Sequence, residues 1–397
     1  MALQPPTKLI KPPPPPVDPA TLFTGKSGRL SAFEASLEFF LHPIMPFFRD
    51  PDVSEIMVNG ADQIYIEKAG RITLTNATFA SETDVRAAAS NIAQFVGQDL
   101  SLERPLLDGR LPDGSRVCIV FGAIASKGTQ ISIRRFARAA VTPEFLLQRD
   151  AITPMAVEFL MLAVKAHRNI IVSGGSGSGK TTLVNVLTLG IADDERIIVI
   201  EDTRELQVQR PHVLQLEARP ADAYGRGQVT VRELFITALR MRPDRLVVGE
   251  VRRGEALDML QAMTSGHHGS MTTLHASSPV DTCHRLETMA LMADVAIPLF
   301  ALRRQIASAI DLIVQTARHS DGRRNTTAIS EVHFDEKADH YVINDIFSMT
   351  GEGNDRKLVY TGNSSDTLKL ILAEGLRDQM VHTQPMLSAA GAPTGGF

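Results

Sequence analysis

The spacing of apolar residues divides the chain into two regions with different expected folds. From residue 31 to 136, short apolar runs bounded by turn signals surround an alanine-rich helical pattern. Strands, a helix and further strands in this order are typical of a small α+β domain. The expected strands are residues 55–59, 64–67, 72–75, 116–121 and 130–136, and the expected helix is 81–96.

From residue 154 to 348, continuous apolar runs of strand length alternate with helical patterns. Apolar strands separated by helices indicate a parallel sheet that is covered by helices on both faces, so this region belongs to the α/β class. The expected strands are residues 169–173, 196–200, 213–216, 246–248 and 270–274.

Three segments lie outside these two domains. Residues 1–30 contain the proline run Pro12–Pro16 and are expected to be a disordered leader, either an unstructured tail or a spacer that docks a partner. Residues 137–153 are expected to be a linker, because a threonine–proline pair at Thr153 starts the next domain. Residues 349–397 are expected to be a C-terminal tail that is partly disordered, with a helix from Ser365 to Met380.

Composition narrows the classes of function. The 397 residues are 44% hydrophobic and 22% charged, as in an average soluble globular protein. The net charge of −4 gives no overall basic field, so we expect no nucleic-acid partner. No stretch reaches the roughly 18–20 apolar residues that cross a bilayer, and residues 1–19 lack the apolar core of a signal peptide. We therefore expect a cytoplasmic chain with no membrane span, which reaches a membrane only through protein partners.

The most specific motif is a phosphate-binding loop that follows an apolar strand and precedes a helix. Its glycines let backbone N–H groups surround a phosphate, and the positive end of the helix dipole faces the same anion. Lys180 is expected to reach the β- and γ-phosphates, and the Thr181 hydroxyl to bind Mg²⁺. A glycine turn without nucleotide is the alternative, but it would seldom have this strand–loop–helix setting. The residues expected to bind ATP here are Gly174, Gly175, Ser176, Gly177, Ser178, Gly179, Lys180, Thr181 and Thr182.

Two acidic residues follow strands of the expected parallel sheet. Glu201 ends the strand 196–200, and Glu250 follows the strand 246–248 after one glycine. Ligands of open α/β sheets bind beyond the carboxyl ends of the strands, so both acids should lie near the phosphate loop. We expect Thr181, with waters held by Glu201 and Glu250, to bind Mg²⁺, and we expect Glu250 to orient the attacking water, although the sequence leaves open which acid is the catalytic base. The alternative is that either one is an acid that faces solvent.

Histidines and arginines supply further candidates. His275 ends the strand 270–274, where a neutral imidazole can contact phosphate or a catalytic carboxylate, while His267 precedes the same strand. A structural role is the alternative for each. Arg240 and Arg242 end the helix before Glu250 and are candidate phosphate contacts. We therefore expect His275 to act in catalysis with Lys180, and His267 to contact the nucleotide.

Four motifs in order resemble those of bacterial secretion-superfamily traffic ATPases. They are Gly174–Thr181, Ile200–Thr203, Leu246–Arg252 and Ser265–Ala276. Within this superfamily the chain is most similar to Tad/Flp pilus assembly ATPases, and it is related to type IV and type II secretion ATPases. Further matching segments extend the likeness over roughly residues 45–348. They are 54–60, 110–116 and 131–136 in the first domain and 305–313 in the second.

The resemblance implies an N-terminal domain followed by a RecA-like P-loop ATPase domain, arranged as a homohexameric ring with ATP bound between the two domains. Glu201 then belongs to the acidic box of the family, Glu250 to its Walker B box and residues 266–275 to its His box. The arginine-bearing motif of the first domain is implied to contact the nucleotide through Arg110, Arg116, Arg134 and Arg135.

The expected function is Mg²⁺-ATP hydrolysis that drives assembly of a Tad/Flp-like type IV pilus against an inner-membrane platform protein, with retraction left open. A type IV secretion ATPase is the first alternative. A nucleotide-gated scaffold that does not hydrolyse ATP is an alternative from another class, and a motor acting on nucleic acid is a third.

Overall fold

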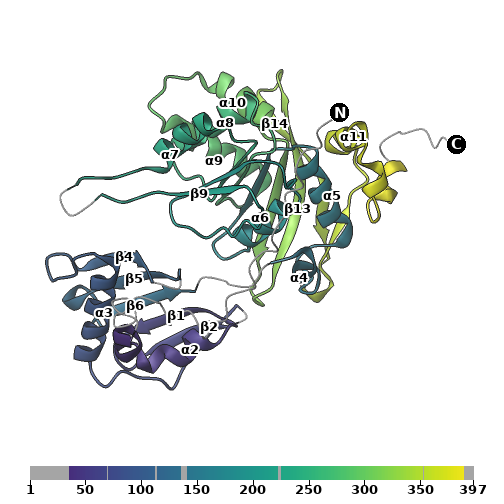
Figure 1. The fold of residues 1–397 in the computed structure, drawn as a ribbon. Helices are drawn as coiled ribbons and strands as arrows, with labels where there is room; N and C mark the ends of the chain where they lie inside the picture. Colours follow the sequence, from purple (N-terminus) through teal and green to yellow (C-terminus); the bar gives the residue numbers. More distant parts are fainter. Residues whose placement is uncertain are drawn as a thin grey trace, which may run out of the picture. The chain divides into compact units, whose positions relative to one another are not determined.

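A computed structural model provides the structure of this chain and describes residues 35–68, 70–111, 114–135, 141–221, 225–351 and 353–388. The leader expected at 1–30 lies outside the described residues. The chain forms two compact units, the first ending at Arg138 and the second beginning at Ala139 (Figure 1).

The first unit is a six-stranded antiparallel sheet in the order β3-β2-β1-β6-β5-β4, with helix α3 packed against it (Figure 1). Ser81 caps α3 by accepting a hydrogen bond from the Asp84 N–H, and Gly97 ends the helix in the left-handed region that glycine tolerates. Strand β4 was not expected, because Asp108 and Gly109 interrupt its apolar pattern. The elements are α2 (Met45–Arg49), β1 (Val53–Asn59), β2 (Ile64–Lys68), β3 (Arg71–Leu74), α3 (Glu82–Val96), β4 (Leu106–Arg110), β5 (Arg116–Val120) and β6 (Gln130–Arg134), together with short 3-10 turns at His42–Ile44 and Gly122–Ile124.

The second unit has a nine-stranded sheet in the order β15-β14-β13-β12-β7-β11-β10-β8-β9. Strands β12, β7, β11, β10, β8 and β9 are parallel to one another, and β13, β14 and β15 extend the sheet beyond β12 in antiparallel pairs. Its strands are β7 (Ile170–Gly174), β8 (Ile197–Glu201), β9 (Val213–Glu217), β10 (Arg245–Val248), β11 (Met271–Leu274), β12 (Leu312–Arg318), β13 (Arg324–Asp335), β14 (His340–Thr350) and β15 (Lys357–Tyr360). Its helices are α4 (Pro143–Leu147), α5 (Pro154–Lys165), α6 (Lys180–Thr188), α7 (Val231–Ala238), α8 (Glu255–Thr264), α9 (Pro279–Leu291), α10 (Leu299–Ala309) and α11 (Asp366–Ala373), and further 3-10 turns lie at Leu239–Met241, Gly353–Asp355, Leu376–Gln379 and Gln384–Ser388.

Two hydrophobic cores lie on opposite faces of this sheet. Ile170 and Val172 of β7 point into the core formed with α5, α6 and α11, whereas Ile171 between them points into the core formed with α7, α8, α9 and α10. Successive side chains of a strand point to opposite faces, so a strand buried on both faces needs an unbroken apolar run. The predicted α/β class with a RecA-like domain is confirmed.

The second unit continues past residue 348, where we expected the ATPase domain to end. That boundary lies inside β14, and the segment after it packs into the core through Leu368, Ile371 and Met386. The Glu158 carboxylate on α5 holds the same segment by accepting hydrogen bonds from three consecutive backbone N–H groups, 381–383. The helix predicted to begin at Ser365 is confirmed by α11, whereas the packing of this segment into the core was not expected, because glycines and polar residues separate its short apolar runs. Within the expected linker 137–153, α4 also buries Leu146 in this core.

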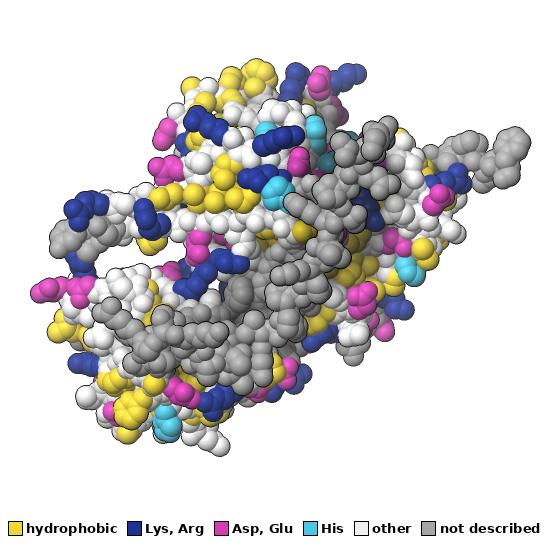
Figure 2. All heavy atoms as spheres, viewed as in Figure 1, with side chains coloured by type: hydrophobic (Ala, Val, Ile, Leu, Met, Phe, Trp, Pro, Cys, Tyr) yellow, Lys and Arg dark blue, Asp and Glu magenta, His cyan; other side chains and the backbone are white. Residues whose placement is uncertain are grey.

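Apolar side chains are exposed around the turn between α9 and α10 of the second unit. Figure 2 shows hydrophobic side chains gathered over this part of the molecule. The exposed members are Leu291, Met292, Val295, Leu299 and Phe300. Among the described helices, none is both long enough and apolar enough to cross a membrane.

Candidate functional site

The expected phosphate loop connects β7 to α6 in the second unit. Gly174 ends β7 with a φ of +153°, and a Cβ added there would lie 2.3 Å from the carbonyl oxygen of Thr316. Gly179 precedes α6 with a φ of +99°. Because an L side chain rarely adopts either conformation, glycine is required for the loop to curl over the start of α6. The Ser178 hydroxyl donates to the Gly175 carbonyl at 2.9 Å and steadies the turn.

Lys180 is the first residue of α6, and its side chain spans the loop. The residue is only 8% exposed. Its Nζ donates hydrogen bonds to the carbonyl oxygens of Gly174 and Gly175, both at 3.0 Å, and lies 3.3 Å from Nδ1 of His275. The ammonium is therefore held where a phosphate bound in the loop would meet it.

Glu250 and His275 meet Lys180 because β10, β11 and β7 are neighbouring parallel strands whose carboxyl ends share one edge of the sheet. Nε2 of His275 lies 2.9 Å from Oε1 of Glu250, while Oε2 of Glu250 accepts a hydrogen bond from Arg252 at 2.6 Å. Oε1 is buried, and the Nε2–H of His275 faces it at 2.9 Å without the alignment of a hydrogen bond, so among the described residues no well-aligned donor reaches this oxygen. An unpaired lone pair on a buried carboxylate can accept a proton or orient a water molecule.

The imidazole of His275 is neutral in this arrangement. Burial lowers its pKa below the ordinary 6.5, and the positive charges of Lys180 and Arg252 add to the effect, although Glu250 opposes it. Since an ammonium only donates, Nδ1 must be the acceptor and Nε2 must carry the proton. One ring thus connects the loop lysine to the acid after β10.

Glu201 lies at the same edge but turns into the protein. Its Oε1 accepts hydrogen bonds from the backbone N–H groups of Glu205 and Leu206, both at 2.8 Å. Burial raises the pKa of Glu201 to about 7, although these two hydrogen bonds oppose the rise. The Thr181 hydroxyl instead donates to Oε2 of Glu205 at 3.3 Å.

Glu205 is a candidate site residue that was not predicted from the sequence. The one available signal was its place as the second glutamate of the acidic run 201–205, directly after a strand. Together with the Thr181 hydroxyl, its carboxylate offers the hard oxygen ligands that Mg²⁺ prefers, so this pair fits the implied metal. The glycine backbone of the loop fits a polyphosphate for the reasons given above.

Three expected nucleotide contacts lie elsewhere in the second unit. His267 precedes the amino end of β11, and Arg240 and Arg242 precede the amino end of β10. The phosphate loop follows the carboxyl end of β7, which is parallel to β11, so these residues lie at the opposite edge of the sheet. A strand of four residues spans about 13 Å. The chain does not bring these three side chains to its own phosphate loop.

The arginines of the first unit divide into two groups. In the strand register Arg110 of β4 lies opposite Arg116 of β5, which lies opposite Arg134 of β6. Residues opposite each other share one face of a sheet, and Asp108 already accepts two hydrogen bonds from Arg116, so the positive charge of this row is compensated in part. Arg135 instead donates to the backbone carbonyls of Phe47 and Asp50 and supports the end of α2.

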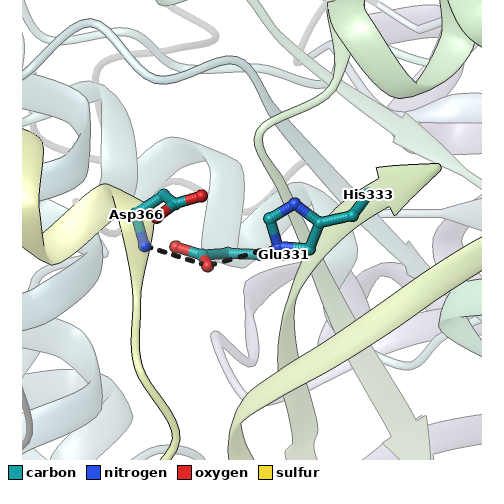
Figure 3. Close-up of side chains that lie close together, drawn as sticks. All are labelled: Glu331, His333 and Asp366. Atoms are coloured by element: carbon teal, nitrogen blue, oxygen red, sulfur yellow. Dashed lines mark hydrogen bonds and ion pairs between the residues drawn. The ribbon is translucent and has the colours of Figure 1, made fainter. Parts of the chain in front are cut away.

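A second cluster of potential metal ligands, Glu331, His333 and Asp366, lies on β13 and at the start of α11 (Figure 3). The buried Glu331 carboxylate already accepts hydrogen bonds from the Ser365 hydroxyl at 2.7 Å and from the backbone N–H groups of Thr367 at 2.8 Å and Asp366 at 3.1 Å. These donors are the unpaired groups at the beginning of a helix. The geometry is that of a buried cap for α11.

Comparison with known proteins shows which family the chain resembles. Residues 40–355 match the family model described as "Type II/IV secretion system protein". The chain is 36% identical over 322 residues to the type IV secretion system protein PtlH homolog of Bordetella bronchiseptica, covering 72% of this chain and 92% of the relative. It is 34% identical over 291 residues to a putative conjugal transfer protein of Mycobacterium tuberculosis, covering 72% and 82%.

Among solved structures, the fold is similar to that of the pilus retraction motor PilT with bound ADP. The TM-score is 0.50 at 20% identity, and the match covers 86% of this chain and 87% of PilT. At this identity the likeness shows the fold alone. The family match over most of the chain and the identity to full-length relatives show more: the chain belongs to the type II/IV secretion system protein family, the secretion-superfamily traffic ATPases.

Proposed function

We propose that this chain hydrolyses Mg²⁺-ATP at the loop 174–181 and uses the energy as the motor subunit of a type IV pilus or secretion machine. The observation that carries the proposal is the chain of contacts from Lys180 through His275 to Glu250 at the end of the phosphate loop. It joins a triphosphate-binding cation to a carboxylate whose buried Oε1 has no well-aligned hydrogen-bond donor among the described residues.

The residues divide the work of phosphoryl transfer. The loop amides and Lys180 hold the β- and γ-phosphates, and Glu250 orients a water through Oε1. His275 contacts both Glu250 and Lys180 and so fixes their positions relative to each other. Thr181 and Glu205 would hold Mg²⁺, which supplies charge neutralisation when bound. Glu201, which the sequence places among the candidates for metal binding and catalysis, shapes the turn that carries Glu205.

The motor proposal also includes a homohexameric ring in which the first unit contributes charge. The row of Arg110, Arg116 and Arg134 supports a second phosphate-binding surface, and His267, Arg240 and Arg242 are available to a neighbouring subunit. The exposed apolar residues 291–300 support further protein contacts. We propose a cytoplasmic location at the inner membrane, reached through platform proteins of the machine.

Two machines remain as candidates. The motif likeness supports assembly of a Tad/Flp-like pilus. A type IV secretion system is the second candidate, because the two relatives described above are named for type IV secretion and conjugal transfer. Deleting the gene decides between them: loss of surface pili with export intact supports the first, and loss of protein or DNA export with pili intact supports the second.

Phosphate release by the purified full chain tests the enzymatic part. Wild type should release phosphate from Mg²⁺-ATP, and Lys180→Ala should lose about 10³-fold or more in turnover. Lys165→Ala is the matched control, because this lysine lies on the outside of α5 and bonds to Gln379. ATP binding without phosphate release by wild type would support the non-hydrolysing scaffold instead. Light-scattering mass with an ATP analogue tests the ring, and a persistent monomer would reject it.

A further inference from the structure

The structure points to Arg252 as a positioning residue for the proposed hydrolysis: we propose that its guanidinium orients Glu250 by holding that carboxylate to Asp202. Its NH1 donates to Oδ2 of Asp202 and its NH2 to Oε2 of Glu250, both at 2.6 Å. Asp202 follows β8 and Glu250 follows β10, so one planar group connects the ends of two neighbouring strands. This inference rests on the proposed function.

The backbone around Arg252 is fixed before the side chain makes any contact. The buried carboxylate of Glu255 accepts hydrogen bonds from the backbone N–H groups of Arg252 at 2.8 Å and Arg253 at 2.9 Å. On the other side of the turn, the Thr273 hydroxyl donates to the Gly249 carbonyl at 2.6 Å. The turn from Gly249 to Glu255 is therefore tied to β11 and to the start of α8, and it presents Arg252 from a rigid base.

The two oxygens of Glu250 consequently have different surroundings. Arg252 occupies Oε2, so Oε1 is directed toward Nε2 of His275, 2.9 Å away. A carboxylate on rotatable bonds would otherwise sample other orientations, and a misplacement of about 1 Å in a reacting group can cost on the order of 100-fold in rate. A guanidinium is suited to this because its fork reaches two carboxylates in one plane, which an ammonium does not match.

Stability is not the reason for this arrangement. The Arg252 side chain is 50% exposed and that of Asp202 is 38% exposed, and exposed ion pairs contribute little to folding. The carboxylate of Glu250, in contrast, is only 14% exposed. The bridge is therefore better explained by its effect on the orientation of Glu250.

The test compares Arg252→Gln with Arg253→Gln in the full chain. Arg253 is the matched control, since it is the neighbouring exposed arginine and its side chain forms no ion pair with any described acid, while its backbone N–H bonds to Glu255 as that of Arg252 does. We expect Arg252→Gln to lower kcat about 10- to 100-fold and to leave KM and the affinity for a fluorescent ATP analogue within about threefold. Arg253→Gln should match wild type.

Two further variants distinguish a positioning role of Arg252 from an effect on folding. Arg252→Lys keeps the charge but holds only one acid at a time, so it should recover part of the lost kcat. Asp202→Asn should lower kcat less than Arg252→Gln does. The double variant should have nearly the same kcat as Arg252→Gln alone, because both substitutions act through one contact. If Arg252→Gln unfolds, Arg252→Lys decides the matter.

The proposal is overturned if Arg252→Gln and Arg253→Gln have equal kcat, or if Arg252→Gln raises KM without lowering kcat. Full activity in Arg252→Lys would also overturn it, because a point charge would then suffice. A wild type with no turnover overturns this proposal and the proposed function together, whereas wild-type turnover with a silent Arg252→Gln overturns this proposal alone.

Discussion

The ammonium of Lys180 donates to Nδ1 of His275, so the lysine of the phosphate loop is bonded to a residue 95 positions further along the chain. This contact exists only while the imidazole is neutral. Burial keeps the pKa of His275 below 6.5, so the neutral form persists at pH 7.

That contact predicts the acid limb of the pH–rate profile. As pH falls through the lowered pKa, His275 gains a proton, Nδ1 stops accepting and the lysine is repelled. We therefore expect kcat to fall with an apparent pKa below 6.5, and His275→Asn to lower kcat and remove this limb. The measurement is kcat from pH 5 to 9, with the exposed His340→Gln as the control. A limb that survives in His275→Asn would assign it to another group.

The bond between Thr181 and Glu205 predicts how activity depends on magnesium. Glu205→Gln removes the charge that would help to hold the metal, so the Mg²⁺ concentration for half-maximal turnover should rise about 10- to 100-fold. Saturating Mg²⁺ should restore most of the rate. Glu217→Gln, at the end of β9, is the control and should need the same Mg²⁺ concentration as wild type for half-maximal turnover. An unchanged Mg²⁺ requirement in Glu205→Gln would remove Glu205 from the site.

Burial of Glu201 predicts a dependence of folding stability on pH. Its folded-state pKa of about 7 is above the ordinary 4.5, so the folded protein binds a proton that the unfolded chain releases between these values. Stability contributed by this group is full below about pH 4.5 and is lost as pH rises to about 7. Glu201→Gln has no such proton and should gain about 1–3 kcal/mol relative to wild type across that window. Thermal melts of both proteins from pH 5 to 8 measure the difference, and parallel profiles would contradict the prediction.

The buried cap at Glu331 predicts that the end of the chain depends on one carboxylate. Glu331→Gln loses the charge and one of two acceptor oxygens that hold the start of α11. We expect a loss of about 1.5–3 kcal/mol and a Tm lower by about 5 °C, while the exposed Glu336→Gln changes nothing. Addition of Zn²⁺ or a chelator should leave the wild-type Tm unchanged, because the carboxylate is already occupied by donors. A Zn²⁺-dependent rise in Tm would instead show a metal site.

Much of the second unit could be predicted from local pattern. The apolar runs at 169–173 and 196–200 are nearly β7 and β8 as observed, because a strand buried on both faces has no alternative to an unbroken apolar sequence. The antiparallel strands β13 to β15 and the docking of 357–388 were missed, because their apolar residues are few and depend on partners distant in sequence, such as Glu158 and Glu331.

For the site, the sequence alone determined which groups can bind phosphate. Glycines at 174 and 179 followed by Lys180 require a curled loop at a helix start, whatever the rest of the chain does. Only the tertiary structure decided how the acids are used. Glu201 and Glu205 both follow β8, yet burial and two backbone N–H groups turn the first inward, while the second faces Thr181. The reason is physical: spacing along a strand sets which edge a side chain reaches, but its direction depends on the neighbours that it finds there.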